Sequence, residues 1–120
     1  MIGGSGFVGS HVADELSRRG FSVTIFDKNP STWLTPDQHF VQGDLLDQAL
    51  LADCCEKAKY VYHFGGVADI GVAKAHPYQT IESNVLGAAA VLEAVGDAGV
   101  ERFVYASTMY VYRLSHTDGN

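Results

Sequence analysis

The chain has 120 residues, which suffice for one ordinary domain with a sizeable core and are too few for two. Hydrophobic residues make up 47% and charged residues 18%, a balance typical of a globular protein and not of a disordered one. The net charge of −6, with only 8 lysines and arginines, argues against a nucleic-acid partner, because phosphate binding needs clustered cations.

Neither a membrane nor a metal is indicated. No apolar run reaches the length of a membrane span, and the first residues lack the order of a signal peptide, so we expect a cytoplasmic protein with no membrane partner. Cys54 and Cys55 are neighbours in sequence, where a disulfide would be strained, so we expect buried or half-buried thiols. Cysteines and histidines show no zinc-ligand spacing, and we predict no metal site.

Strand-like and helical patterns alternate along the chain. A helix begins inside the glycine-rich segment "GGSGFVG" and closes at Gly20, a typical C-terminal cap. Asp47 is placed to cap a second helix. The other predicted elements are, in order, strands at 21–27 and 39–44, a strand at 60–66, a loop to Pro77, a long helix at 78–99 and a strand at 102–108.

This alternation predicts an α/β fold: a Rossmann-type doubly wound parallel sheet in three αβα layers, with right-handed crossovers. We expect one partial domain of this type over residues 1–112 and an unstructured tail over 113–120.

The glycine-rich segment fits two dinucleotide-binding registers. Gly4, Gly6 and Gly9 match G-x-G-x-x-G, and Gly3, Gly6 and Gly9 match G-x-x-G-x-x-G. In both registers, absent side chains permit a tight turn and bring backbone N–H groups close to a pyrophosphate at a helix N-terminus. Taken without the rest of the sequence, the glycine pattern would also fit an ordinary flexible loop that binds nothing.

Asp27 favours the dinucleotide interpretation. It ends the next predicted strand, about 20 residues after the glycine-rich segment. An acid at this spacing can accept hydrogen bonds from the adenosine ribose hydroxyls and repel a 2′-phosphate. The cofactor we predict is therefore NAD. Lys28 weakens the preference over NADP, because a cation there could receive a phosphate.

Several motifs, in order, resemble one family. They are "GGSGFVGSHVADEL", "FD", "VQGDLLD", "VYHFGG", "SNVLGAAAVLEA" and "RFVYASTMYVY". Together they resemble the extended short-chain dehydrogenase/reductases, also called the NAD-dependent epimerase/dehydratase family, over nearly the whole chain.

The resemblance implies a set of cofactor-binding residues. The pyrophosphate would lie against the glycine-rich loop, the ribose at the next strand end, the adenine at "GDL" and the rest of the cofactor at "FGG". The residues so implied are Gly3, Gly6, Phe7, Val8 and Gly9, then Asp27 and Lys28, then Asp44 and Leu45, and then Phe64, Gly65 and Gly66. Asp44 has an alternative role in ending a strand and capping the segment after it.

Four further residues are implied near the nicotinamide. Asn84 would support the strand ends there, and Ala106 and Ser107 would lie beside the ring. Thr108 would contact the substrate hydroxyl, which makes it the catalytic candidate. His63 stands before an apolar residue in a strand, so we interpret it as a core histidine and not as a base.

The tyrosine and lysine that the family uses as base and acid are not found in these 120 residues. No tyrosine here begins a Tyr-x-x-x-Lys motif, and Arg113 replaces the family's glycine after "VY". We therefore interpret the chain as the cofactor-binding part of a nucleotide-sugar epimerase or dehydratase, an oxidoreductase or isomerase acting by hydride transfer, that is inactive by itself. In the longer protein the substrate would be a nucleotide sugar or another small hydroxyl or carbonyl compound, and a homodimer stays open.

Two alternatives remain: a non-catalytic NAD(P)-binding module, and part of a hydroxysteroid dehydrogenase or flavonoid reductase. By the family alignment, Met1 and Ile2 take the place of the last two residues of a central strand between 21–27 and 60–66. Without the rest of that strand, we expect the isolated chain to be poorly stable or associated.

Overall fold

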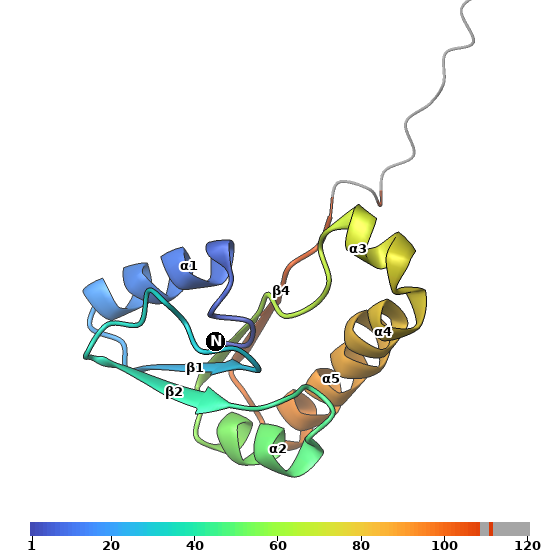
Figure 1. Cartoon of the computed structure of the whole chain (residues 1–120). Coiled ribbons are helices and arrows are strands. Elements are labelled where there is room, and N and C mark those ends of the chain that lie inside the picture. The colour runs from blue at the N-terminus through green and yellow to red at the C-terminus, as the bar shows by residue number, and fades with distance from the viewer. Residues whose placement is uncertain (109–110, 112–120) are drawn as a thin grey trace, which may run out of the picture.

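Parallel strands alternate with helices in the computed structural model, which describes residues 1–108 and 111 (Figure 1). The strands are β1 (Val23–Asp27), β2 (Gln38–Gln42), β3 (Tyr60–His63) and β4 (Arg102–Tyr105). The helices are α1 (Phe7–Arg18), α2 (Gln48–Glu56), α3 (Ile70–Ala75), α4 (Pro77–Ile81), the π-helical turn η1 (Glu82–Leu86) and α5 (Gly87–Asp97).

The strands form two parallel pairs that meet at Ile2. β1 pairs with β2, and β3 pairs with β4. Ile2 forms a parallel bridge to Phe26 on one side and to His63 on the other, so the order is β2, β1, Ile2, β3, β4. The predicted central position of the first two residues is thereby confirmed.

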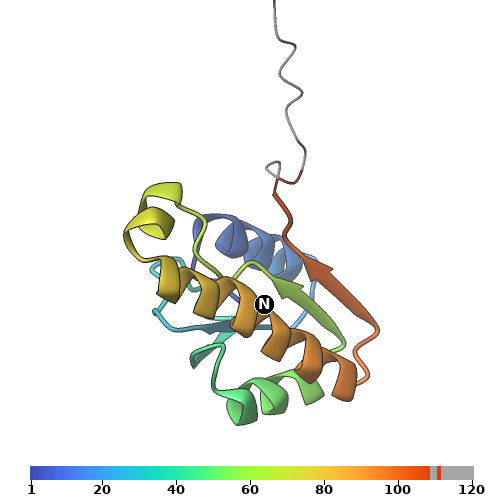
Figure 2. The ribbon, with the colours of Figure 1, turned by 90° about the vertical axis from the view of Figure 1, so that its right-hand side faces the viewer.

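Helices cover both faces of this sheet. α1 lies on one face, and α2 and α5 lie side by side on the other (Figures 1 and 2). Two layers of helices around parallel strands are the doubly wound architecture that the alternation of patterns predicts.

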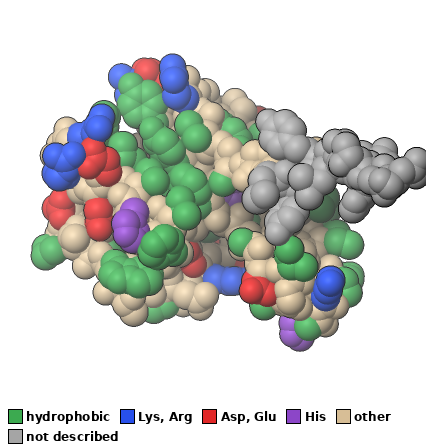
Figure 3. All heavy atoms as spheres, turned by 90° about the horizontal axis from the view of Figure 1, so that it is seen from above, with side chains coloured by type: hydrophobic (Ala, Val, Ile, Leu, Met, Phe, Trp, Pro, Cys, Tyr) green, Lys and Arg blue, Asp and Glu red, His purple; other side chains and the backbone are tan. Residues whose placement is uncertain are grey.

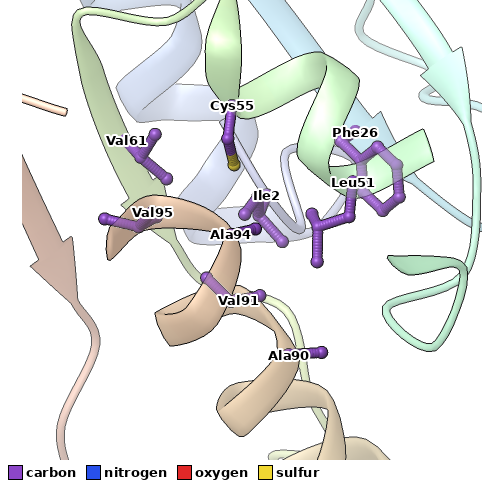
Figure 4. Close-up of a cluster of buried hydrophobic side chains, with 9 residues drawn as sticks. All are labelled: Ile2, Phe26, Leu51, Cys55, Val61, Ala90, Val91, Ala94 and Val95. Atoms are coloured by element: carbon purple, nitrogen blue, oxygen red, sulfur yellow. The ribbon is translucent and has the colours of Figure 1, made fainter. Parts of the chain in front are cut away.

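The main core lies between the sheet and the pair α2 and α5. Alanines and valines of α5 recur at helical spacing and point at Ile2, at Leu51 of α2 and at the strands. Figure 4 shows this cluster, which consists of Ile2, Phe26, Leu51, Cys55, Val61, Ala90, Val91, Ala94 and Val95. A smaller cluster under α1 contains Ala13, Val23 and Ile25. Ile2 thus contributes to packing as well as to pairing.

The predicted helix ends are confirmed at two points. Gly20 has φ +84° after α1, a conformation that glycine adopts without strain. Asp47 caps α2, where its side chain accepts a hydrogen bond from Leu50 N at 3.2 Å. Both helix ends depend on residues that are close in sequence, so they could be predicted from the sequence.

The prediction of a continuous loop up to Pro77 is wrong. Residues 70–75 form α3, capped by Asp69, which accepts from Val72 N at 2.8 Å. No residue of α3 is buried, so this six-residue helix is not part of the core whose hydrophobic spacing predicted the longer helices. The predicted strands also extend past the observed ones, because 64–66 and 106–108 continue beyond the paired residues.

One hydrophobic surface remains open on the α1 side. Hydrophobic side chains gather on the face that carries α1 (Figure 3). A hollow of about 740 Å³ there is lined by residues of α1, the start of β3 and Arg102, among them Phe7, Val8, Leu16, Phe21 and Tyr60. Phe7 is 72% exposed, so this part of α1 has no covering layer within the described chain.

Candidate cofactor site

A cleft of about 300 Å³ lies at the carboxyl ends of β1 and β3. Segments from four parts of the chain form its walls, as expected at the carboxyl edge of a doubly wound sheet. They are Gly3, Ser5 and Gly6; Phe26, Asp27, Lys28, Asn29 and Pro30; Gly43, Asp44 and Leu45; and Phe64, Gly65, Gly66, Val67 and Ser83.

Gly3 and Gly9 cannot carry a side chain without colliding with the backbone of neighbouring segments. Gly3 has φ +74°, and a Cβ there would overlap the backbone of Gly65. A Cβ on Gly9 would overlap the carbonyl oxygen of Gly3 and approach Gly4 Cα at 2.9 Å. The loop therefore packs against both the start of α1 and the end of β3.

Gly6 differs from both. A Cβ there would meet only Gly3 O at 3.5 Å, an ordinary contact. Gly6 is exposed, lines the cleft and stands as N-cap of α1 with φ −75° and ψ 169°, an extended conformation open to any residue. Protein packing thus leaves the space in front of Gly6 free at the positive end of a helix.

Asp27 lies at the rim of the cleft and binds the loop beside it. Its Oδ2 accepts a hydrogen bond from Ser5 N at 3.1 Å, and its Oδ1 accepts one from Asn29 N at 3.0 Å. The Ser5 hydroxyl donates to Asn29 O at 2.7 Å, which joins the two loops a second time. A carboxylate oxygen has a further lone pair, so both oxygens remain able to accept from a ligand hydroxyl.

The adenine side predicted from "GDL" lies where β2 ends. The Phe26 ring packs so close to Gly43 that a Cβ there would fall 2.6 Å from the ring. Asp44 is exposed, and its Oδ1 accepts from Leu46 N at 3.0 Å. The local structural role considered for Asp44 is therefore present, while its other oxygen stays available at the cleft.

Asn84 closes the far side of the cleft without lining it. Its amide accepts from Val67 N at 2.7 Å and donates to Val67 O at 2.9 Å, which fixes the backbone just after Gly66. Asn84 belongs to η1, and a π-helical turn of this kind often marks a functional position. This geometry supports the structural role predicted for Asn84.

His63 is a core residue, as the sequence predicts. Its side chain is 1% exposed, and burial lowers its pKa to about 4, so the ring is neutral near pH 7. Its Nδ1 accepts from Gly65 N at 3.3 Å, and its ring lies 5.2 Å from that of Tyr105. His63 holds the chain after β3 in place.

Several predicted site residues fall outside the cleft lining. Phe7 and Val8 line the hollow on the α1 side, and Gly9 is buried beneath the loop. Past β4, Ala106 N donates to His63 O at 3.0 Å. Ala106, Ser107 and Thr108 are exposed and do not line the cleft, and Thr108 O accepts from Val111 N at 3.3 Å. The predicted tail at 113–120 lies outside the described residues.

Conversely, the cleft contains residues that the sequence motifs did not single out. Ser5, Asn29 and Pro30 border the Asp27 side, and Val67 and Ser83 border the other. Ser5 lies within the glycine-rich segment and Ser83 begins the segment "SNVLGAAAVLEA", so their place inside these motifs was the available signal.

Other kinds of site receive no support from the described residues. No group of three or more His, Cys, Asp or Glu side chains in 1–108 and 111 could hold a metal ion. None of the helices described combines the length and hydropathy needed to cross a bilayer. Cys54 is half-buried and Cys55 buried, and both thiols are free, as predicted.

Known proteins with this architecture are numerous. A protein from Klebsiella pneumoniae named UDP-glucose 4-epimerase is 30% identical over 93% of this chain and 89% of its own length. One of the same name from Erwinia amylovora is 33% identical, over 93% of this chain and 37% of its own. The UDP-glucose 4-epimerase of Stenotrophomonas maltophila, solved with bound NAD and formylated UDP-arabinopyranose, superposes with a TM-score of 0.87 at 30% identity, covering 98% of this chain and 39% of that one.

The chain spans just over a third of the length of most of these relatives. The family model described as the NAD dependent epimerase/dehydratase family matches residues 1–119, nearly the whole chain. Together with the glycine-rich loop, the acid at the end of β1 and the parallel doubly wound sheet, this match shows that the chain belongs to the NAD-dependent epimerase/dehydratase family.

Proposed function

We propose that the cleft binds NAD and that the chain is the cofactor-binding part of a nucleotide-sugar epimerase or dehydratase. The observation that carries the proposal is Gly6: the protein leaves the space before it free, at the N-terminus of α1 and inside a cleft that a Cβ would begin to fill. An anionic pyrophosphate fits that position, because α1 presents unpaired N–H groups and a positive dipole end.

The residues around the cleft suit the remaining parts of NAD. Asp27 would accept hydrogen bonds from the adenosine ribose, and Asp44 and Leu45 would flank the adenine. Phe64, Gly65 and Gly66 would line the cofactor toward the nicotinamide. The relative with bound NAD supports this assignment, since its matching part has the same fold.

NAD is preferred over NADP in this proposal because of Asp27. A 2′-phosphate would stand beside a carboxylate that two backbone N–H groups already fix in place. Lys28 is exposed at the same rim and acts in the opposite direction. We therefore expect a preference of moderate size.

The chemistry that NAD supplies when bound is hydride transfer to and from a substrate carbon. We propose that Thr108, as the family resemblance implies, contacts the substrate hydroxyl in the longer protein. Because no Tyr-x-x-x-Lys occurs in these 120 residues, we expect this chain to bind cofactor without turnover.

Calorimetric titration with NAD and NADP tests the proposal on three proteins: the natural chain, Gly6→Val and Gly96→Ala. Gly6→Val fills the cleft and should weaken NAD binding at least about tenfold, while the free energy of unfolding changes by about 1 kcal/mol or less. Gly96→Ala is the matched control, because nothing lies within 4 Å of a Cβ there. Equal NAD affinity in all three proteins would contradict the proposed site.

Asp27→Asn tests the cofactor preference separately. The amide keeps one acceptor oxygen but removes the charge, so the ratio of the NADP to the NAD dissociation constant should fall at least about fivefold. Tighter binding of NADP by the natural chain would contradict the role assigned to Asp27.

A further inference from the structure

Three hydrogen bonds form a closed ring at the rim of the cleft. Ser5 N donates to Asp27 Oδ2 at 3.1 Å, Asn29 N donates to Asp27 Oδ1 at 3.0 Å, and the Ser5 hydroxyl donates to Asn29 O at 2.7 Å. Asp27 ends β1 and Asn29 lies in the loop after it, while Ser5 belongs to the glycine-rich loop before α1. Ser5 therefore joins the two loops through its backbone and through its side chain.

The backbone on the Asp27 side of the ring has supports that do not involve Ser5. Gly43 N donates to Asp27 O at 3.0 Å, and a side chain of β2 donates to Lys28 O at 3.0 Å. These bonds do not fix the rotation of the Asp27 side chain or the carbonyl of Asn29. Ser5 binds both of these groups, so the direction of the carboxylate depends on it.

The negative charge of Asp27 is not neutralised by a neighbouring cation. Within residues 1–108 and 111, no lysine or arginine forms an ion pair with it, although Lys28 is next in sequence. Backbone N–H groups hold the two carboxylate oxygens and leave the full charge in place. Because solvent weakens the repulsion between exposed charges with distance, such a carboxylate rejects a phosphate only while it stays directed at it.

The Ser5 hydroxyl differs from that of Ser10, the next serine in the chain. Ser10 is buried, and its hydroxyl donates to Phe7 O at 3.0 Å within its own helix. The bond from the Ser5 hydroxyl to Asn29 O is exposed and joins residues 24 positions apart at the cleft. It contributes little to the free energy of unfolding, so its effect should be felt at the ligand.

We propose that Ser5 is a positioning residue for cofactor specificity, whose hydroxyl closes the ring and keeps both oxygens of Asp27 directed at the adenosine ribose. The inference rests on the proposed function, because Asp27 is the group that would touch the ligand. With the ring closed, the ribose hydroxyls meet acceptors that are already in place, so less conformational entropy is lost on binding. With the ring open, the carboxylate binds the ribose less well and repels a 2′-phosphate less.

Ser5→Ala tests the proposal in calorimetric titrations with NAD and NADP. The NAD dissociation constant should rise at least about threefold, and the ratio of the NADP to the NAD dissociation constant should fall at least about threefold. Ser31→Ala is the matched control, because the Ser31 hydroxyl accepts from Trp33 N at 3.1 Å in the same loop as Asn29 and does not line the cleft. Both dissociation constants should be unchanged in this control.

A double-mutant cycle separates this role from a general loosening of the cleft. In the Asp27→Asn protein, adding Ser5→Ala should change the ratio by less than about 1.5-fold, because the charge that the ring directs is already removed. A general loosening would instead weaken the binding of NAD and NADP equally, whether or not the carboxylate is present.

The titrations distinguish failure of this inference from failure of the proposed function. If the natural chain binds NAD and Ser5→Ala leaves the ratio unchanged, the proposed site stands and the role of Ser5 is refuted. An equal change of the ratio in the natural and Asp27→Asn backgrounds would also refute it, since Ser5 would then act independently of the carboxylate. If the natural chain binds neither cofactor, the proposed function fails and the inference fails with it.

Discussion

The two ends of β1 and β3 differ in what holds them together. At the carboxyl ends, short polar contacts and close glycine packing join the segments: Asp27 binds Ser5 N, Asn84 binds Val67, and Gly9 packs on Gly3. At the amino ends, the same two strands face each other across an apolar cavity. These contacts are concentrated at the edge where we place the cofactor, which suits a site that must present backbone N–H groups at fixed positions.

Gly9→Ala should cause the largest loss of stability among the variants of the carboxyl-end edge of β1 and β3. The added Cβ would overlap Gly3 O, and neither backbone segment can move without displacing α1 or the end of β3. We expect a loss of about 3 kcal/mol in the free energy of unfolding, measured by urea denaturation. The matched control Gly96→Ala lies in α5 with open space around it and should stabilise the chain by about 0.5 to 1 kcal/mol. Similar midpoints for both variants would show that the loop packing is looser than described.

Asn84→Ala should weaken the same edge from the other side. Both backbone groups of Val67 lose their partner, and we expect a loss of about 2 kcal/mol in unfolding free energy. Asn84→Asp serves as the control, since it keeps the acceptor for Val67 N but sets a carboxylate oxygen against Val67 O. If Asn84→Asp were as stable as the natural chain, the bond to Val67 O would be unimportant.

The free energy of unfolding should depend on pH through the Met1 amino group, which donates to Thr24 O near the amino end of β1 and whose pKa is lowered by burial. The pKa of the Met1 amino group is about 6 in the folded chain against 8.0 as its ordinary value, so the unfolded chain binds more protons between pH 6 and pH 8. Stability should therefore fall by about 2 kcal/mol as the pH falls from 8 to 6, and this contribution should be constant below 6. Thermal or urea unfolding of the free and the N-terminally acetylated chain across this range measures it. Identical pH slopes for the two chains would contradict the assignment to Met1.

Ser5→Ala should have the smallest effect. It removes the hydroxyl that donates to Asn29 O, while the backbone bond from Ser5 N to Asp27 stays. Because the hydroxyl contact is exposed, we expect a loss of about 0.5 kcal/mol in unfolding free energy. Urea denaturation measures this loss, and Ser5→Thr, which keeps the hydroxyl, serves as the control and should be as stable as the natural chain. A loss of stability larger than that of Asn84→Ala would contradict the minor role of this hydroxyl.

Much of the site could be predicted because its signals are local in sequence. Three glycines, the acid at the end of the next strand and the helix cap at Asp47 each depend on short-range geometry. Gly3, Gly6, Asp27 and Asp44 all line the same cleft. Their roles toward NAD stay predictions that the titrations test.

Other features required the assembled chain. Ser5 became relevant only because its N–H and hydroxyl meet Asp27 and Asn29 across the loop. The short helix α3 has no buried residue, and no hydrophobic period predicted it. Gly6 and Gly9 look alike in the motif, and only the positions of their neighbours separate a glycine needed for packing from one whose open space suits a ligand.

The sequence by itself determined the alternation of strands and helices, the family resemblance and the location of the glycine-rich turn, because hydrophobic period and turn chemistry depend on neighbouring residues. The tertiary structure decided how β1 and β3 meet, since pairing between residues far apart depends on the positions of whole strands. It showed which backbone groups Ile2 pairs at one end of β1 and β3, and it revealed the largely apolar cavity of about 430 Å³ that separates these strands at the other end.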